Sequence, residues 1–157
     1  MLNLKKILYP TDFSEYSLAA LPYAAVLAQQ NDAQLYCLHV VEMPKEEHLI
    51  GDYMVPLNVP HVPEDKILRT ARTRLERFVS EHLSEIDNVT PRVLTGTPFV
   101  EIIRYARDQF IDLIVIGTHG HSALAAMLLG TVAEKVVRKA PCPVLTVRDP
   151  RHKFEAP

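Results

Sequence analysis

Cysteine is scarce in the chain and tryptophan is absent, and the scarcity of cysteine excludes some classes of protein. Its 157 residues include no tryptophan and two cysteines, Cys37 and Cys142. Two cysteines so far apart form neither the disulfide framework of a small secreted protein nor the spacing of a zinc or redox motif. We therefore expect two buried, reduced thiols.

An excess of charge of one sign and long apolar runs are also missing. The chain carries 17 lysines and arginines against 19 aspartates and glutamates, a net charge of −2, which argues against binding nucleic acid through bulk charge. No apolar stretch is long enough to span a bilayer, and residues 1–6 lead into a strand pattern without the features of a signal peptide. The expectation is a cytoplasmic protein that neither binds nucleic acid nor inserts into a membrane.

Glycine is scarce too, and its placement is uneven. Three of the five glycines, Gly117, Gly120 and Gly130, lie within fourteen residues, and Thr131 follows the last of them. Glycine allows close approach of a ligand to the backbone, and a helix N-terminus favours phosphate. The spacing predicts a phosphate site at the start of a helix. The alternative is that these are turn glycines at a junction between a strand and a helix.

Strand and helix patterns alternate along the chain. The helical patterns begin at Ser14, Glu64, Thr97 and Val132, and the strand patterns cover residues 6–9, 35–41, 92–94, 112–117 and 144–147. Such alternation predicts one α/β domain, residues 1–157, in which helices cover both faces of a five-stranded parallel sheet. For the strand order 3-2-1-4-5, the order reverses between the first and fourth strands. Ligands bind at such a point, so the turn Pro10-Thr11-Asp12 and residues 117–120 are expected to face one crevice.

Two segments fall outside this alternation. Residues 43–63 hold four prolines and one glycine, and they predict a long, irregular and mobile connection whose role the sequence leaves open. Residues 148–157 form a polar tail. The helix predicted for residues 64–86 interleaves arginines with glutamates, which is typical of a solvated face rather than of a nucleic-acid patch.

Four segments together resemble the universal stress protein family. They are residues 6–14 (KILYPTDFS), Leu38-His39-Val40, the pattern Gly117-x2-Gly120-x9-Gly130-Thr131, and residues 141–147 (PCPVLTV). The glycine pattern is similar to that of the family's ATP-binding branch. The resemblance implies a fold like that of the adenine nucleotide α-hydrolases, a dimer, and binding of ATP or AMP in a stress-response role.

The resemblance also implies roles for single residues. Val40 would offer backbone groups to the adenine edge, and Asp12 would lie near the adenine and the ribose. The glycines would surround the phosphates. The expected nucleotide site comprises Pro10, Thr11, Asp12, Val40, Gly117, Thr118, Gly120, His121, Ser122, Gly130, Thr131 and Val132. Three alternatives stay open: Asp12 caps the first helix, Val40 is a core residue, and Thr131 caps the last helix. His39 is expected to be structural, because no other metal ligand shares its spacing.

One departure from the family concerns phosphate charge. His121 and Met127 stand where relatives often carry basic residues. A neutral histidine contributes little charge, so triphosphate binding is expected to need a divalent cation, Mg²⁺ or Mn²⁺, held through the phosphates. No metal site is expected from side chains.

Other functions on similar folds are less well supported by the sequence. No Gly-Lys-Ser/Thr phosphate loop occurs, a receiver domain needs an aspartate where the chain has Leu94-Thr95-Gly96, and an electron carrier of the flavodoxin type needs a phosphate loop after the first strand. We expect no catalytic residue and favour an ATP- or AMP-dependent sensor that acts on an unknown protein partner. The alternative is a slow ATPase or nucleotidyl-transfer enzyme.

The last strand is expected to be an edge of the sheet. Edge strands expose unpaired backbone groups that invite pairing with another chain. A homodimer is therefore predicted through Val144, Leu145, Thr146 and Val147. The alternative is that residues 148–157 cover this edge.

Overall fold

The protein folds into a five-stranded parallel sheet between two layers of helices. A computed structural model describes residues 3–43, 48–50, 53–55, 62–119 and 129–149. Gly120, His121 and Ser122 of the expected site, and residues 150–157 of the tail, lie outside the described residues.

The sheet has the strand order expected from the sequence. It contains β1 (Lys6–Pro10), β2 (Gln34–Val41), β5 (Val89–Thr95), β6 (Leu113–Gly117) and β7 (Val144–Val147). They lie in the order β5-β2-β1-β6-β7, and every neighbouring pair is parallel. Numbered along the chain within this sheet, that order is 3-2-1-4-5, so the predicted fold class is confirmed.

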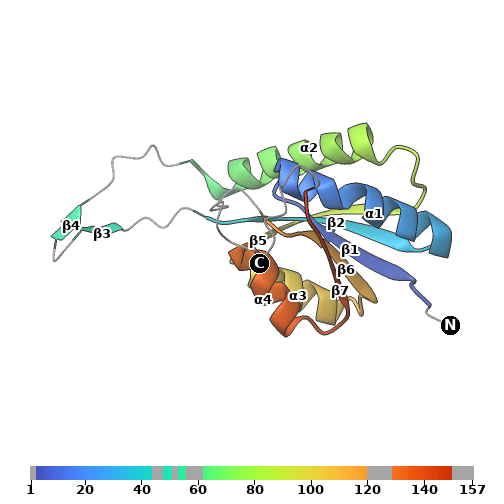
Figure 1. The fold of residues 1–157 in the computed structure, drawn as a ribbon. Coiled ribbons are helices and arrows are strands. Elements are labelled where there is room, and N and C mark those ends of the chain that lie inside the picture. Colours follow the sequence, from blue (N-terminus) through green and yellow to red (C-terminus); the bar gives the residue numbers. More distant parts are fainter. Residues whose placement is uncertain (1–2, 44–47, 51–52, 56–61, 120–128, 150–157) are drawn as a thin grey trace.

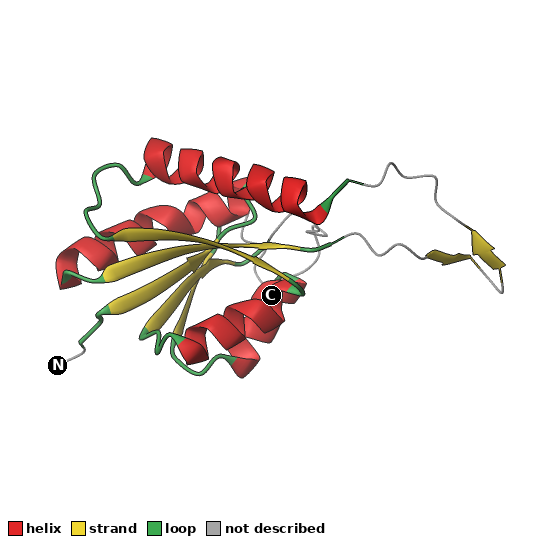
Figure 2. Cartoon of the chain, turned by 180° about the vertical axis from the view of Figure 1, so that it is seen from behind, coloured by secondary structure: helices red, strands yellow, loops and turns green. Residues whose placement is uncertain are grey.

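Two helices cover each face of the sheet. They are α1 (Glu15–Asn31) and α2 (Glu64–His82) on one face, and α3 (Pro98–Asp108) and α4 (Thr131–Lys139) on the other. Figure 2 shows the sheet between these two layers. No described helix is both long and apolar enough to cross a membrane.

The alternation of side chains along the central strands divides the core into two clusters. In β1, Ile7 and Tyr9 pack beneath α1 and α2, whereas Leu8 packs on the side of α3 and α4. In β6, Leu113 and Val115 belong to the first cluster and Ile114 to the second. Because successive side chains point to opposite faces, a sheet covered on both sides needs consecutive apolar residues, which β1 has at residues 7–9 and β6 at residues 113–116.

Local sequence signals set the starts of α1 and α3. Ser14 caps α1, and its side chain accepts a hydrogen bond from the Ser17 N–H at 3.2 Å. Pro98 is the first residue of α3 and follows the N-cap Thr97, a position where proline loses no helical hydrogen bond.

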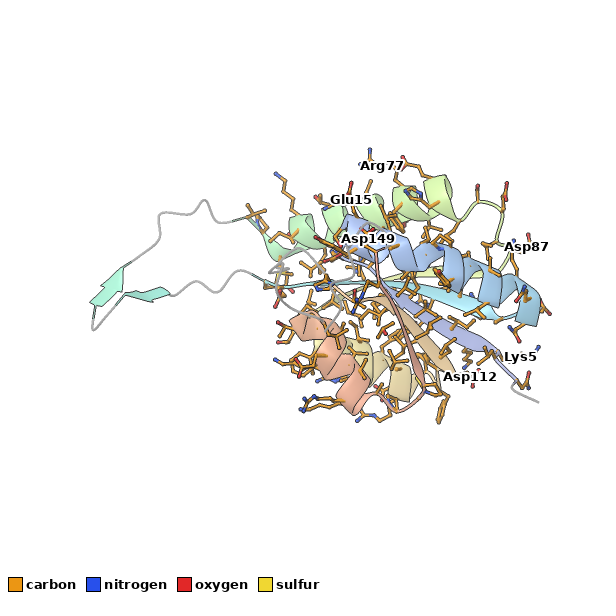
Figure 3. All side chains as sticks on the ribbon, viewed as in Figure 1. Lys5, Glu15, Arg77, Asp87, Asp112 and Asp149 are labelled. Atoms are coloured by element: carbon orange, nitrogen blue, oxygen red, sulfur yellow. The ribbon has the colours of Figure 1, made fainter. Side chains whose placement is uncertain are left out.

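At the far end of the sheet, Asp112 links β1 to the start of β6. Its Oδ2 atom accepts hydrogen bonds from the backbone N–H groups of Lys5 and Lys6, each at 2.8 Å. Figure 3 labels Lys5 and Asp112 near the N-terminus.

The structure differs from the sequence prediction in the long connection after β2. Residues 43–63 were expected to be irregular, but they contain an antiparallel pair, β3 (His48–Ile50) and β4 (Tyr53–Val55). Each strand is only three residues long, which is too short for a clear alternation. The signal that identifies the hairpin is the dipeptide Gly51-Asp52 between the triplets His48-Leu49-Ile50 and Tyr53-Met54-Val55.

Two element boundaries also differ. The second helix ends at His82 rather than at Ile86, although Leu83 remains buried against the core. The third parallel strand begins at Val89 rather than at Arg92. Pro91 within it suggests a break, but β5 is an edge strand, where proline is tolerated.

Candidate functional site

A cavity of about 450 Å³ opens at the carboxyl ends of the central strands. Its size is in the range of small-molecule sites. It is lined by the last residues of β1, β2 and β6, by the loops that follow them and by the start of α4. The cavity therefore includes the point between β1 and β6 where the strand order reverses.

Every expected site residue that the structure describes lines this cavity. These residues are Pro10, Thr11, Asp12, Val40, Gly117, Thr118, Gly130, Thr131 and Val132. The turn after β1 and the segment after β6, about a hundred residues apart in the sequence, therefore meet in one hollow.

The turn between β1 and α1 is held by its own side chains. Thr11 Oγ1 accepts a hydrogen bond from the Phe13 N–H at 3.0 Å and lies 2.9 Å from Ser17 Oγ. Asp12 Oδ1 accepts from the Ser14 N–H at 3.0 Å and from the Ser14 hydroxyl. The N-cap of α1 is Ser14, so the alternative that Asp12 caps this helix is wrong in its simple form. Asp12 supports the cap and also lines the cavity.

A buried tyrosine anchors the same turn from below. The Tyr9 hydroxyl donates to the Ser17 carbonyl at 2.9 Å, and the Ser17 hydroxyl donates to the Ser14 carbonyl at 2.9 Å. Burial raises the pKa of Tyr9 well above its ordinary value of 10.0. Tyr9 therefore stays protonated at neutral pH and acts as a hydrogen-bond donor to α1.

Three side chains from separate elements form a stack at one side of the cavity. The Arg74 guanidinium carbon lies 4.2 Å from the centre of the Phe13 ring, and that ring lies 4.5 Å from the ring of His39. The Nδ1 atom of His39 is 2.8 Å from the Thr11 carbonyl oxygen. This contact supports the structural role expected for His39, although the residue lines the cavity as well.

Backbone groups of β2 extend beyond the end of β1. The Thr11 N–H donates to the Leu38 carbonyl, and the Gly96 N–H donates to the Val41 carbonyl on the side of β5. Backbone groups of alternate residues in a parallel strand point to opposite sides. The N–H and carbonyl of Val40 therefore point to the side of β1, which ends at Pro10. These two groups face the cavity and can recognise the edge of a heterocyclic base.

Two of the clustered glycines have a packing reason. A Cβ on Gly117 would collide with the Tyr16 carbonyl oxygen in the first turn of α1. A Cβ on Gly130 would lie 2.9 Å from the Thr118 carbonyl oxygen, to which the Gly130 N–H also donates. Neither glycine has the positive φ of a turn glycine, so close packing accounts for both, and it keeps both backbones at the cavity wall.

The start of α4 forms the wall after β6. Gly130 is its N-cap and Thr131 its first residue, so the alternative that Thr131 caps the helix is wrong. Glycine has no side chain to occupy the free N–H groups of the first helical turn. These amides and the positive end of the helix dipole favour an anion.

The side of the cavity beneath α3 and α4 is apolar. Leu38, Ile102 and Ala133 belong to the second core cluster and line the cavity together with Pro98 and Val132. A flat ring system can bury its faces here without leaving a polar group unpaired. The sequence analysis missed Leu38, Ile102 and Ala133, because local patterns mark them as core residues and only the tertiary structure exposes them to a cavity.

Other lining residues were also missed as site residues. They are Ser17, His39, Val41, Glu42, Arg74, Pro98, Ile116 and His119. Arg74 in particular belongs to the helical face that the sequence predicted to be solvated. Among the described residues, no group of three or more His, Cys, Asp or Glu side chains is arranged to hold a metal ion.

Comparison with known proteins gives a consistent result. Residues 3–148 match the model of the Universal stress protein family. The chain is 35% identical over 147 residues to universal stress protein MJ0531 of Methanocaldococcus jannaschii, covering 94% of this chain and 84% of that protein.

Solved structures share the fold. The structure of protein MJ0577 has a TM-score of 0.74 and 28% identity, with 95% of this chain and 99% of that one covered. A universal stress protein in complex with cAMP has a TM-score of 0.65 and 22% identity, with 93% and 98% covered.

Proposed function

Because the chain belongs to the universal stress protein family, we propose that its cavity binds an adenine nucleotide, ATP or AMP, and that the protein is a nucleotide-dependent sensor. The observation that carries the proposal is the meeting of three complementary surfaces in one hollow. These are an apolar wall, the backbone N–H and carbonyl of Val40 beside it, and the N-terminus of α4. They correspond to the face of a base, the edge of a base and a phosphate.

The adenine is placed by the first two surfaces. Its faces contact Leu38 and Ile102, and its edge exchanges hydrogen bonds with the backbone of Val40. Asp12 lines the same cavity, and its carboxylate is the proposed acceptor of hydrogen bonds from the ribose hydroxyls. The choice of adenine nucleotides as ligands to test also follows from the cAMP complex of a protein with this fold.

The phosphates are placed by the third surface. The amides of Thr131 and Val132 and the backbone at Gly117 surround them, and Gly120, His121 and Ser122 complete the set expected from the family pattern. A divalent cation, Mg²⁺ or Mn²⁺, reaches the protein through the phosphates rather than through side chains.

The proposed output is recognition by a protein partner in the cytoplasm, from a homodimer formed through β7. A slow ATPase or nucleotidyl transferase is the alternative on this fold. The two are separated by phosphate release from ATP under saturating conditions. A sensor retains ATP intact for many minutes, whereas turnover near or above about 1 s⁻¹, the range of ordinary enzymes, identifies an enzyme.

The binding proposal is tested by thermal unfolding of protein stripped of copurified nucleotide. A ligand at about a hundredfold excess over its dissociation constant adds about 2.7 kcal/mol to stability. The unfolding temperature should therefore rise with ATP or AMP, and more with ATP when Mg²⁺ is present.

A further inference from the structure

The cavity has one arginine or lysine among its described lining residues, and that residue is Arg74. Its carboxylates, by contrast, are Asp12 and Glu42. Arg74 comes from α2, the helix that the sequence analysis assigned to solvent. The positions where the family often carries cations hold His121 and Met127 instead. The positive charge that a polyphosphate needs is therefore available from Arg74 on α2, a helix that the sequence does not mark as part of the site.

Packing holds the Arg74 guanidinium at the cavity. Its central carbon lies over the Phe13 ring, 4.2 Å from the ring centre, a position that stabilises a cation on an aromatic face. Phe13 itself is fixed by contacts on two sides, with His39 at 4.5 Å and Phe78 at 5.5 Å between ring centres. Phe13 also has a φ of 62°, a left-handed conformation that bulky residues rarely adopt. This backbone cost is in keeping with a role beyond core packing.

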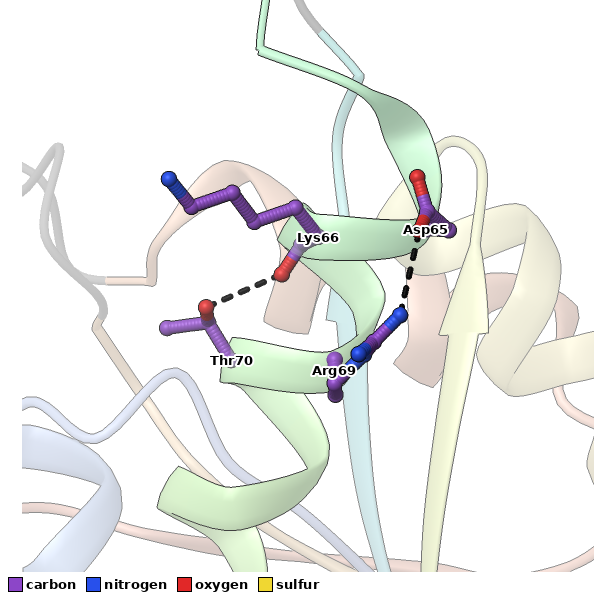
Figure 4. Close-up of polar contacts among 4 residues, drawn as sticks. All are labelled: Asp65, Lys66, Arg69 and Thr70. Carbon is purple, nitrogen blue, oxygen red and sulfur yellow. Dashed lines mark hydrogen bonds and ion pairs between the residues drawn. The ribbon is translucent and has the colours of Figure 1, made fainter.

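The edge of the guanidinium is available to a ligand. The ion pairs among the described residues do not involve Arg74, which is exposed to solvent. Arg69, about one turn earlier on α2, pairs instead with Asp65 at 3.1 Å, as Figure 4 shows. The N–H donors of a guanidinium point outward in the plane of the group. When an aromatic ring covers one face of the group, these donors remain at its edge, where two of them can bind one phosphate.

We propose that Arg74 is a phosphate-binding residue of this cavity and that it raises the affinity for ATP above that for AMP. The inference rests on the proposed nucleotide function and adds a phosphate contact from the α2 side of the sheet, opposite the start of α4. AMP places one phosphate at α4 and leaves Arg74 without a partner. ATP carries two further phosphates, which reach Arg74 from the α4 side of the same cavity.

Arg77 provides the matched control. It lies three residues after Arg74 on the same helix. Both arginines line a groove on α2, but of the two only Arg74 also lines the cavity. Figure 3 shows Arg77 on the outer side of α2, away from the sheet. Arg74→Gln and Arg77→Gln change the net charge equally, so a difference between them reports a local contact and not the overall field.

The experiment measures dissociation constants for ATP, AMP and adenosine by calorimetry at one fixed Mg²⁺ concentration, for the parent, Arg74→Gln, Arg74→Lys and Arg77→Gln. Loss of a charged hydrogen bond weakens binding by about tenfold or more. We expect that loss for ATP with Arg74→Gln, a smaller loss with Arg74→Lys, and little change for AMP and adenosine. Arg77→Gln should bind all three like the parent.

The outcomes separate the two proposals. If Arg74→Gln weakens ATP, AMP and adenosine equally, Arg74 acts through the packing of Phe13 and the inference is wrong. It is also wrong if Arg74→Gln and Arg77→Gln bind ATP like the parent. If the parent binds none of the three, the nucleotide function itself fails. Circular dichroism on each variant shows whether the fold is retained.

Discussion

The carbonyl oxygen of Tyr16 occupies the space in which a Cβ on Gly117 would lie. This contact presses the first turn of α1 against the end of β6. It holds the turn after β1, with Asp12, close to the segment after β6. A glycine at the end of β6 thus allows the close packing that brings the two walls of the cavity together. Gly117 has this packing role whether or not it also contacts a ligand.

Gly117→Ala should therefore destabilise the protein. The added methyl group meets backbone rather than a flexible side chain, so α1 or β6 must shift, at a cost of about 1–3 kcal/mol. Urea unfolding measures the change. A parent-like midpoint for Gly117→Ala would show that the contact is not tight.

Asp12 combines a structural and a binding role, and two substitutions separate them. Asn keeps an oxygen that accepts from the Ser14 N–H, so Asp12→Asn should unfold near the parent midpoint. It should nevertheless weaken nucleotide binding, because it loses the charge that strengthens a hydrogen bond from ribose. Ser14→Ala removes the N-cap of α1 and should cost about 1 kcal/mol of stability.

Calorimetry with AMP and urea unfolding measure both quantities on both variants. The interpretation of Asp12 as a ligand contact would be contradicted if Asp12→Asn bound AMP as tightly as the parent does. Ser14→Ala also removes the hydroxyl that donates to Asp12 Oδ1, so a fall in its affinity for AMP would report displacement of the Asp12 carboxylate and not the loss of stability alone.

Alkaline pH should destabilise the fold through buried acids. Burial raises the pKa of Cys37 from 9.0 to about 12 and shifts the pKa of Tyr9 upward as well. The unfolded chain releases the Cys37 proton at a lower pH than the folded chain does. Stability from this group is therefore complete below pH 9 and falls as the pH rises toward 12.

Urea unfolding at a series of pH values from about 8 to 11 tests this linkage. The midpoint of the parent should fall across the series, and Cys37→Ala should show a shallower fall from a lower starting value. A parent midpoint independent of pH in this range would show that these groups titrate alike in both states.

The structure shows which residue of β7 can be changed to test the predicted dimer without damage to the fold. Leu145 packs partly buried against the first core cluster, so replacing it with a charge would damage the fold itself. The carbonyls of Pro143 and Val147 accept hydrogen bonds from the segment containing β6. By alternation, the N–H of Thr146 points to the outer edge, and Thr146 is exposed.

Thr146→Pro should therefore remove an intermolecular donor and leave the pairing of β7 with β6 in place. Light scattering should show a dimer for the parent and a monomer for this variant, while Thr146→Val, which keeps the N–H, stays dimeric. A parent that is monomeric at high micromolar concentration would exclude the dimer. A dimeric Thr146→Pro would move the interface elsewhere.

The sequence determined the fold through short-range signals. Ser14 and Pro98 begin helices where expected, and apolar runs place the strands of the sheet. Signals of this kind depend on a few neighbouring residues. The hairpin of β3 and β4 was not predicted, because each strand has too few residues to show the alternation of apolar and polar side chains by which a strand is recognised.

The cavity was predictable where a motif marks it and not where packing alone creates it. The turn at Asp12 and the glycines after β6 stand out in the sequence. Arg74 and Ile102 do not, since both follow ordinary helical patterns. At the cavity, the Arg74 guanidinium lies over the ring of Phe13, whose backbone is in a left-handed conformation. No local pattern encodes that contact.

Calorimetric titration of nucleotide-free protein with ATP, AMP and GTP, in the presence of Mg²⁺, is the direct test of adenine-nucleotide binding. We expect saturable binding of ATP and AMP to one site per chain and much weaker binding of GTP, because the backbone of Val40 faces the edge of the base. Gly120→Asp, which brings a like charge to the phosphates, should abolish the signal. The absence of binding by both ATP and AMP to a folded protein would contradict the account.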